Sequence, residues 1–306
     1  MYDLIIIGGG PAGCSAAVYA ARKRLKTLLI TEDWGGQSTD SSDIQNWIGT
    51  ISISGADFGK SLREHVEAYA GDCVDVIDNV KVQSIKNVEE SVSVTASDLN
   101  TYQSQTVLIT SGSRRRKLTI PGAEKFEHKG VTYCASCDGP MFTDKPVVVI
   151  GGGNAGFESA AQLQAYVSYV TILQKNENFK ADPITVEKVL QNTNVTGITN
   201  AEPIEIHGEN FVTGVSYKDE TDEIREIEAN GVFVEIGLIP NTDFVEGLLD
   251  MDDFKRIKID PWNQRTSEKR IWAAGDCTNI LYHQNNISSG HAVTALEDIY
   301  LYLKAS

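Results

Sequence analysis

The stretch that decides the fold is Leu4-Ile5-Ile6-Ile7-Gly8-Gly9-Gly10-Pro11-Ala12-Gly13. Its apolar run predicts a buried strand, and the small residues from Pro11 to about Arg24 predict a helix. A second apolar run, Thr27 to Thr31, completes a strand–helix–strand unit of the kind found in parallel sheets. Glycines between strand and helix let the N-terminus of the helix approach a phosphate. The sequence therefore predicts a dinucleotide-binding unit.

Two further observations make this prediction specific. Glu32 follows the second expected strand, where an acidic side chain accepts hydrogen bonds from an adenosine ribose. The pattern also recurs: the strand Val147–Ile150 leads into Gly151-Gly152-Gly153-Asn154-Ala155-Gly156, then a helix to about Tyr166 and a strand at Val170–Leu173. One chain is thus expected to bind two dinucleotides.

Between the two glycine turns lies Cys134-Ala-Ser-Cys137-Asp138-Gly139. Two residues between the cysteines allow a small, reducible disulfide, in which each sulfur can serve as nucleophile or leaving group. The alternatives are half of a zinc site or two unrelated thiols. Zinc usually requires a second Cys or His pair at matching spacing, but the sequence has no other CxxC and its five histidines are scattered. We therefore predict a redox pair and no metal site.

Length, charge and cysteine use exclude several classes of protein. A chain of 306 residues suits about two domains, and a net charge of -15 argues against nucleic-acid binding. The basic run Arg114–Lys117 is either a patch for an acidic partner or, more commonly, a solvated connector. No apolar stretch approaches the roughly 20 residues that span a bilayer, and the first residues do not resemble a secretion signal. Five cysteines do not suggest a disulfide framework, so a cytoplasmic protein is expected.

The remaining segments suggest how the domains are connected. A helix is expected over Gly55–Gly71, antiparallel-like strands over Val74–Thr110, and further strands near 211–217, 224–227 and 231–236. The last portion, with a helix at about 288–303, has no strong glycine turn and is expected to complete the first domain. The predicted fold is α/β, with two Rossmann-like three-layer domains, the second inserted into the first. The first spans 1–114 and 245–306, and the second, with the dithiol, spans 115–244.

The sequence resembles the low-molecular-weight thioredoxin reductases and, more closely, the catalytic core of the alkyl hydroperoxide reductase flavoprotein subunit. The resemblance covers essentially the whole chain, and its most specific element is the Cys134–Pro140 motif. The other motifs are the two glycine turns, Gly35-Gly36-Gln37, Asn46-Trp47, Gly237-Leu238-x-Pro240-Asn241-Thr242, and Ala273-Ala274-Gly275-Asp276-Cys277 followed by Gln284.

The resemblance implies FAD in the first domain and a nicotinamide nucleotide in the second. Within it, Gly10, Ala12 and Gly13 hold the FAD pyrophosphate and Glu32 the ribose. The full FAD set that it implies is Gly8, Gly10, Pro11, Ala12, Gly13, Glu32, Gly36, Gln37, Asn46, Ser111, Gly112, Gly275, Asp276, His283, Gln284 and Asn285. The nicotinamide set is Gly151, Gly153, Asn154, Ala155, Gln174, Lys175 and Lys180.

The resemblance also implies catalytic roles. Cys137 faces the flavin, Cys134 attacks the disulfide of the partner, and Asp138 shuttles a proton as a general acid. The alternative for Asp138 is a turn residue, because Asp-Gly is a common turn pair. The flavoprotein subunit carries an N-terminal redoxin-like region, whereas this sequence begins at the flavin domain. We therefore expect electrons to pass to a separate thioredoxin- or glutaredoxin-like protein, and we expect the enzyme to be a homodimer.

The electron donor is the least determined feature. Members that use NADPH carry an arginine clamp for the 2′-phosphate, and here that region reads Gln174-Lys175-Asn176-Glu177-Asn178-Phe179-Lys180. Lysines supply charge without the guanidinium fork, and Gly156 is compatible with NADH, so NADH is favoured over NADPH. A donor such as ferredoxin or a second flavin, and a redox sensor without turnover, are the alternatives. Near the expected flavin, His283 replaces an Arg, Asn285 and Asn286 replace apolar residues, and Ala292 replaces a Gly.

Overall fold

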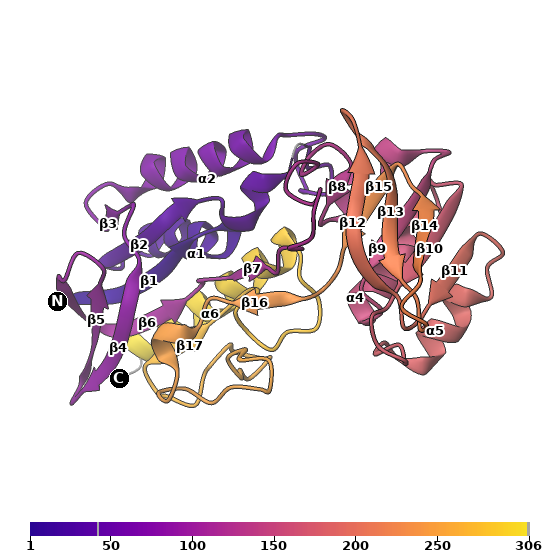
Figure 1. Ribbon diagram of the computed structural model, residues 1–306. Helices are drawn as coiled ribbons and strands as arrows, with labels where there is room; N and C mark the ends of the chain where they lie inside the picture. The colour runs from indigo at the N-terminus through magenta and orange to yellow at the C-terminus, as the bar shows by residue number, and fades with distance from the viewer. Residues whose placement is uncertain (42, 305–306) are drawn as a thin grey trace. The chain divides into compact units, whose positions relative to one another are not determined.

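Two largely parallel sheets carry the fold, each in its own unit of the chain (Figure 1). The structure is a computed structural model that describes residues 1–41 and 43–304. One unit comprises Met1–Arg114 with Ile239–Ser306, and the other Arg115–Leu238. Residues 305–306, which the sequence assigned to the first domain, lie outside the described residues. Among the described residues, no helix combines the length and apolar character needed to span a lipid bilayer.

The first unit contains the first glycine turn. Its elements are β1 (Tyr2–Gly9), α1 (Pro11–Arg22), β2 (Thr27–Trp34), η1 (Gly36–Asp40), α2 (Gly55–Ala70), β3 (Val74–Ile77), β4 (Val82–Val88), β5 (Ser91–Ala96), β6 (Thr101–Ile109), η3 (Asp243–Val245), β17 (Ile271–Ala273) and α6 (Asn285–Lys304). In the described chain the sheet order is β3-β2-β1-β6-β5-β4, with β17 also paired to β6. The strand order therefore reverses between β1 and β6.

This unit has two apolar cores, one on each face of its sheet, and alternate side chains of β1 point into one or the other. Leu4 and Ile6 pack on the side where α1, α2 and α6 lie, together with Phe58 and Leu296. Ile5 and Ile7 face the other side, where residues of β4, β5 and the segment around Val245 and Leu249 cover the sheet. Because both faces of the strand are buried, β1 is an unbroken apolar run in the sequence.

The second unit has the same plan. Its elements are β8 (Val131–Thr132), α3 (Ala135–Asp138), η2 (Gly139–Phe142), β9 (Pro146–Ile150), α4 (Asn154–Leu163), β10 (Tyr169–Leu173), α5 (Pro183–Leu190), β11 (Val195–Ile198), β12 (Glu202–Gly208), β13 (Val212–Lys218), β14 (Ile224–Glu228) and β15 (Gly231–Val234). The parallel sheet runs β11-β10-β9-β15-β8 among described residues. Val147 and Val149 pack with α4 and α5, whereas Val148 and Ile150 pack with the β12-β13-β14 sheet. The predicted three-layer α/β class is confirmed.

The connection that returns to the first unit lies between residues 238 and 239, whereas the sequence placed it between 244 and 245. The difference has a local cause. Asn241 donates from its backbone N–H to Gly112 O at 3.0 Å and from its side chain to Ser111 O at 2.9 Å. These bonds tie residue 241 to the first unit. The short strands β7 (Ser113–Arg115) and β16 (Leu238–Pro240), where the chain crosses, pair with each other.

One prediction about strand direction is wrong. The segment from Val74 to Thr110 was expected to be antiparallel throughout, but β3 pairs with β2 in parallel. Only β4, β5 and β6 form the antiparallel meander, and β6 pairs in parallel with β1 on its other edge. Alternation of apolar residues reports which faces are buried and carries no information on the direction of the neighbouring strand.

Candidate active site

The turn between β1 and α1 brings backbone atoms unusually close together. A Cβ on Gly13 would lie 1.8 Å from Gly8 O, and one on Gly8, whose φ is +114°, would lie 2.4 Å from Thr110 O. Both positions therefore require glycine. Within the described chain no side chain caps the start of α1, which follows Gly10. Its first N–H groups are thus free to bind an anion such as a pyrophosphate.

A cavity of about 810 Å³ opens at this turn, within the first unit. Twelve of the residues expected to bind FAD line it: Gly8, Gly10, Pro11, Ala12, Glu32, Gly36, Gln37, Ser111, Gly112, Gly275, Asp276 and Asn285. The volume suits a large ligand, and the position is the carboxyl end of β1 and β6, where the strand order reverses. The backbone N–H groups at the start of α1, the carboxyl group of Glu32 and the volume of the cavity together fit a dinucleotide such as FAD.

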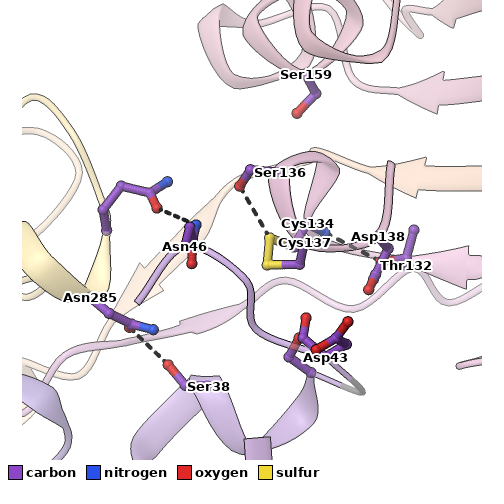
Figure 2. The surroundings of a disulfide bond; sticks show 12 residues. Ser38, Asp43, Asn46, Thr132, Cys134, Ser136, Cys137, Asp138, Ser159 and Asn285 are labelled. Atoms are coloured by element: carbon purple, nitrogen blue, oxygen red, sulfur yellow. Dashed lines mark hydrogen bonds between the residues drawn. A yellow bond between two sulfur atoms is a disulfide. The ribbon is translucent and has the colours of Figure 1, made fainter. Parts of the chain in front are cut away.

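The other expected FAD residues lie beside the cavity and organise its wall. Asn46 donates a hydrogen bond to Gln284 Oε1 at 3.1 Å, and His283 Nδ1 lies 3.4 Å from Asp276 Oδ1. Ser38 donates to Asn285 Oδ1 at 2.8 Å, as Figure 2 shows. Gln284 and Asn285 thus connect the start of α6 to the segment after β2, and His283 connects it to the loop after β17. Gly13 lies beneath the turn, as its close approach to Gly8 requires.

The cavity also includes residues that sequence reasoning missed. Lys81 Nζ lies 3.8 Å from Glu32 Oε2, and Arg114 donates to Asn241 Oδ1 at 2.9 Å. Asp33 lines the cavity next to Glu32, and its pKa is raised, mainly by desolvation and then by the Glu32 charge. None of these belongs to a glycine motif. Asp33 lies in β2 next to Glu32, Lys81 lies between β3 and β4, and Arg114 and Asn241 lie where β7 and β16 pair.

The second glycine turn repeats the geometry of the first. A Cβ on Gly156 would lie 1.8 Å from Gly151 O, and Gly151 has a φ of +122°. Gly153 precedes α4, which no side chain caps in the described chain. Asn154 accepts a hydrogen bond from Asp182 N at 2.8 Å, and Ala155 is exposed on the first turn. The start of α4 is therefore open to an anion.

The three side chains expected at the nucleotide ribose have different surroundings. Gln174 is buried, with its Oε1 accepting from Gly152 N at 3.2 Å and its Nε2 donating to Asn178 O at 2.9 Å. Lys175 pairs with Glu202 at 2.6 Å. Lys180 is exposed, and its backbone N–H donates to Gly152 O at 2.8 Å. Gln174 therefore braces the turn, and the charge of Lys175 is already compensated.

Cys134 and Cys137 form a disulfide with Cα atoms 5.3 Å apart (Figure 2). Cys134 immediately precedes α3, directly after β8, and Cys137 is the third residue of that helix. Cys134 Sγ lies 3.5 Å from Ser136 Oγ. Asp138 accepts a hydrogen bond from the Thr132 hydroxyl, which also accepts from Cys134 N at 3.4 Å. The predicted redox pair is therefore assembled in the oxidised state, with a carboxyl group one residue away.

Among the described residues, the other cysteines are free thiols. Cys14 is buried and donates to Gly9 O at 3.2 Å, and burial raises its pKa to about 12. Cys277 is fully buried, and desolvation raises its pKa to about 11. Thiols with such raised pKa values are poor nucleophiles at neutral pH. Both behave as packing residues.

Two nucleotide turns and a reducible disulfide define the class of dithiol flavin oxidoreductases. The model of the pyridine nucleotide-disulphide oxidoreductases matches residues 2–296, and the chain belongs to this family of enzymes. It is similar to an NADH dehydrogenase of Ferdinandcohnia aciditolerans, with 41% identity, and to the F subunit of alkyl hydroperoxide reductase from Staphylococcus aureus, with 38%. Both alignments cover 99% of this chain, which spans 57% and 59% of the two relatives.

Among solved structures, the thioredoxin reductase from Streptococcus pyogenes is similar to the chain, with a TM-score of 0.88 and 33% identity. The match covers 100% of this chain and 99% of that one. The expected resemblance and fold are confirmed. Membership of the family implies FAD and a nicotinamide nucleotide as cofactors.

Proposed function

We propose that this protein is an FAD-dependent disulfide reductase, which passes electrons from a nicotinamide nucleotide through FAD and the Cys134/Cys137 dithiol to a separate thioredoxin- or glutaredoxin-like protein. The observation that carries the proposal is the Cys134–Cys137 disulfide itself, placed at the carboxyl end of β8 in the unit that also holds the second glycine turn. A reducible disulfide can pass two electrons to a partner by thiol–disulfide exchange, which suits it to electron transfer in a unit that also carries a nucleotide turn.

The first unit is proposed as the FAD-binding domain, and the second as the nicotinamide-binding domain with the dithiol. The cavity of about 810 Å³, which Glu32 and Asp276 both line, supports this assignment. When bound there, FAD supplies the chemistry that connects a two-electron donor to a disulfide. Gly10, Ala12 and the start of α1 bind the pyrophosphate, and Glu32 binds the ribose.

The dithiol chemistry follows from thiol–disulfide exchange. In the reduced protein, the Cys134 thiolate attacks the partner disulfide, forms a mixed disulfide and releases one partner thiolate. Cys137 then attacks the Cys134 sulfur, which releases the second partner thiolate and restores the Cys134–Cys137 bond. Two electrons pass to the partner, and Asp138, hydrogen-bonded to Thr132, is proposed to supply a proton to a leaving thiolate.

NADH is proposed as the preferred donor. Lys175 is paired with Glu202 and lies in an open hollow of about 400 Å³, which it shares with Lys218 and several acids: Glu177, Glu202, Asp219, Glu220 and Asp222. A 2′-phosphate would be repelled by these carboxylates and would find no guanidinium fork. The pairing of Lys175 therefore strengthens the preference that the sequence indicated.

The proposal includes a homodimer and a cytoplasmic location. The free thiols at Cys14, Cys73 and Cys277, among the described residues, suit a reducing compartment. Light scattering of the purified holoprotein measures the assembly, and a monomeric mass would overturn the dimer.

Anaerobic titration tests the function directly. NADH, NADPH and reduced ferredoxin are added in turn to the oxidised holoprotein, and bleaching of the flavin is followed. NADH should bleach it at least as effectively as NADPH, and the reduced protein should then reduce an added thioredoxin or glutaredoxin disulfide. A tenfold preference for NADPH would overturn the proposal that NADH is the preferred donor. Bleaching by ferredoxin alone would favour the alternative route, and extraction of FMN or of no flavin would overturn the FAD assignment.

A further inference from the structure

Glu235 occupies a special position in the second unit. It follows β15, which lies between β9 and β8 in the parallel sheet. The carboxyl end of β9 carries the glycine turn, and that of β8 carries the dithiol helix α3. Strand order reverses between β9 and β15, since the chain continues from β9 to β10 and β11 on the other side. Dinucleotides bind in the crevice at such a reversal.

The contacts of Glu235 place its carboxyl group beside α4, at Ser159 in the middle of that helix. Ser159, on that helix, donates to Glu235 Oε1 at 2.6 Å, and the backbone oxygen of Glu235 is the atom that a Cβ on Gly151 would approach to 2.2 Å. In Figure 2 the Ser159 hydroxyl points toward the segment that carries the disulfide, and α3 packs against α4. In the sheet order, Glu235 thus follows the strand that lies between the one leading to the glycine turn and the one leading to the dithiol.

The electrostatic surroundings make this carboxyl group titratable near neutrality. Desolvation raises the pKa of Glu235 to about 7, and the charge of Glu158 acts in the same direction. The Ser159 hydrogen bond and the charge of Arg115 oppose this increase. A small change in its surroundings therefore decides whether the group carries a charge.

The topology also indicates which half of a dinucleotide lies nearest. In this fold the adenosine half lies toward the second strand of the βαβ unit, here β10. The nicotinamide half then lies on the opposite side of the glycine turn, over β15 and β8. That half contains the only part of the dinucleotide whose charge changes in the reaction, because the ring is neutral when reduced and cationic when oxidised.

Building on the proposed function, we propose that Glu235 is a positioning residue of the nicotinamide half-site whose carboxylate favours the oxidised, cationic ring over the neutral reduced ring. Transfer of a hydride from the reduced ring to the flavin removes two electrons from the ring, reduces the flavin by two electrons and leaves the positive charge beside this carboxylate. The ionised group therefore promotes transfer out of the nucleotide and also tightens binding of the oxidised product. The neutral acid does neither.

The test compares NAD⁺ with ADP-ribose, which keeps the pyrophosphate and both riboses but lacks the pyridinium ring. Binding of each to the oxidised holoprotein is measured by calorimetry from pH 6 to pH 8.5. The ratio of NAD⁺ affinity to ADP-ribose affinity should rise about fivefold over this range, as expected for one screened charge pair. Glu235→Gln should remove the rise, and Glu228→Gln, which removes a charge from an exposed position on β14, should leave it intact.

Ser159→Ala separates this role from a structural one. Loss of the hydrogen bond that stabilises the carboxylate should move the midpoint of the affinity ratio to higher pH, an effect that a packing defect would not produce. A ratio that is independent of pH, or the same in Glu235→Gln and the parent, overturns the inference while leaving the proposed donor site in place. Failure of both nucleotides to bind overturns the proposed function as well.

Discussion

Cys134 and Cys137 differ in position within their own unit, and that difference can be tested residue by residue. Cys134 precedes α3 with its sulfur 3.5 Å from Ser136 Oγ, and Cys137 lies at the third position of the helix. With Cys137 as the flavin-facing thiol, Cys134→Ser should produce a thiolate-to-flavin charge-transfer band at long wavelength, and Cys137→Ser should not. Both variants should lose disulfide reduction, by at least about a hundredfold, because the exchange requires two thiols.

Absorbance spectra and a redoxin reduction assay measure these effects. Cys73→Ser provides the control, since it removes a partly buried thiol from the first unit without touching the disulfide. A variant of either disulfide cysteine that reduced its redoxin at the parental rate would contradict the relay.

Glu235 gives a second prediction at the residue scale, on stability. Its pKa is raised from the usual value near 4.5 to about 7, so the folded chain binds more protons than the unfolded chain between these values. Stability contributed by this group is therefore lost as the pH rises from about 4.5 to about 7, and the loss amounts to roughly 3 kcal/mol. Glu235→Gln should remove that loss and gain stability relative to the parent as the pH increases.

Hydrogen exchange of β9 and β15 amides in increasing urea measures the free energy of opening in the unit that holds Glu235. The difference between variant and parent at pH 5 and pH 8 isolates this group from the others. If the free energies of opening of variant and parent differed by the same amount at both pH values, the pKa of the Glu235 carboxyl group would not be raised.

At the scale of the element, the strand–turn–helix unit explains why so few residues decide the fold. Gly13→Ala would place a Cβ 1.8 Å from Gly8 O, whereas a Cβ on Gly10 meets no described atom within 4 Å. Gly13→Ala should therefore destabilise the apoprotein by about 2 kcal/mol or more. Gly10→Ala should leave apoprotein stability nearly unchanged and weaken FAD binding, because Gly10 lines the cavity.

Urea unfolding of the two apoproteins and FAD titration of each provide the comparison. Similar loss of stability in both variants would mean that the turn tolerates no side chain at all, and that ligand contact does not distinguish the two glycines.

Elements with a repeated local pattern could be predicted from the sequence, and those defined by distant contacts could not. β1, α1, β2, β9, α4 and β10 were all expected, because buried strands and glycine turns have local patterns. The sequence predicted no element at α5, β11 or β12. Lys81 was missed in the cavity for a related reason. Its place depends on which strands are neighbours in space, and only the sheet order provides that. Asp33 directly follows Glu32, and no motif singled it out.

Gln174 shows the same limit for a single side chain. Its position after β10 predicted contact with a ribose, but its carboxamide bonds to Gly152 and Asn178. The spacing of a motif places a residue near a site, and the local hydrogen bonds decide whether its side chain is available.

At the scale of the whole molecule, each unit buries its own apolar clusters against the two faces of its own sheet. A ligand stabilises the structure that binds it and leaves an independent core unaffected. FAD should therefore protect backbone amides of the first unit, and NAD⁺ those of the second.

Hydrogen exchange of the holoprotein, the apoprotein and the holoprotein with NAD⁺ tests this division. Removal of FAD should raise exchange at the start of α1, in η1 and around Gly275, which surround the cavity, while the amides of β9 and β15 change little. Addition of NAD⁺ should lower exchange at the start of α4 and at the end of β15. Gly156→Ala, which would bring a Cβ 1.8 Å from Gly151 O, should abolish the second effect alone. Changes in β9 and β15 on FAD removal as large as those in β1 would mean that the two cores open together, and that the proposed nucleotide sites are coupled through folding.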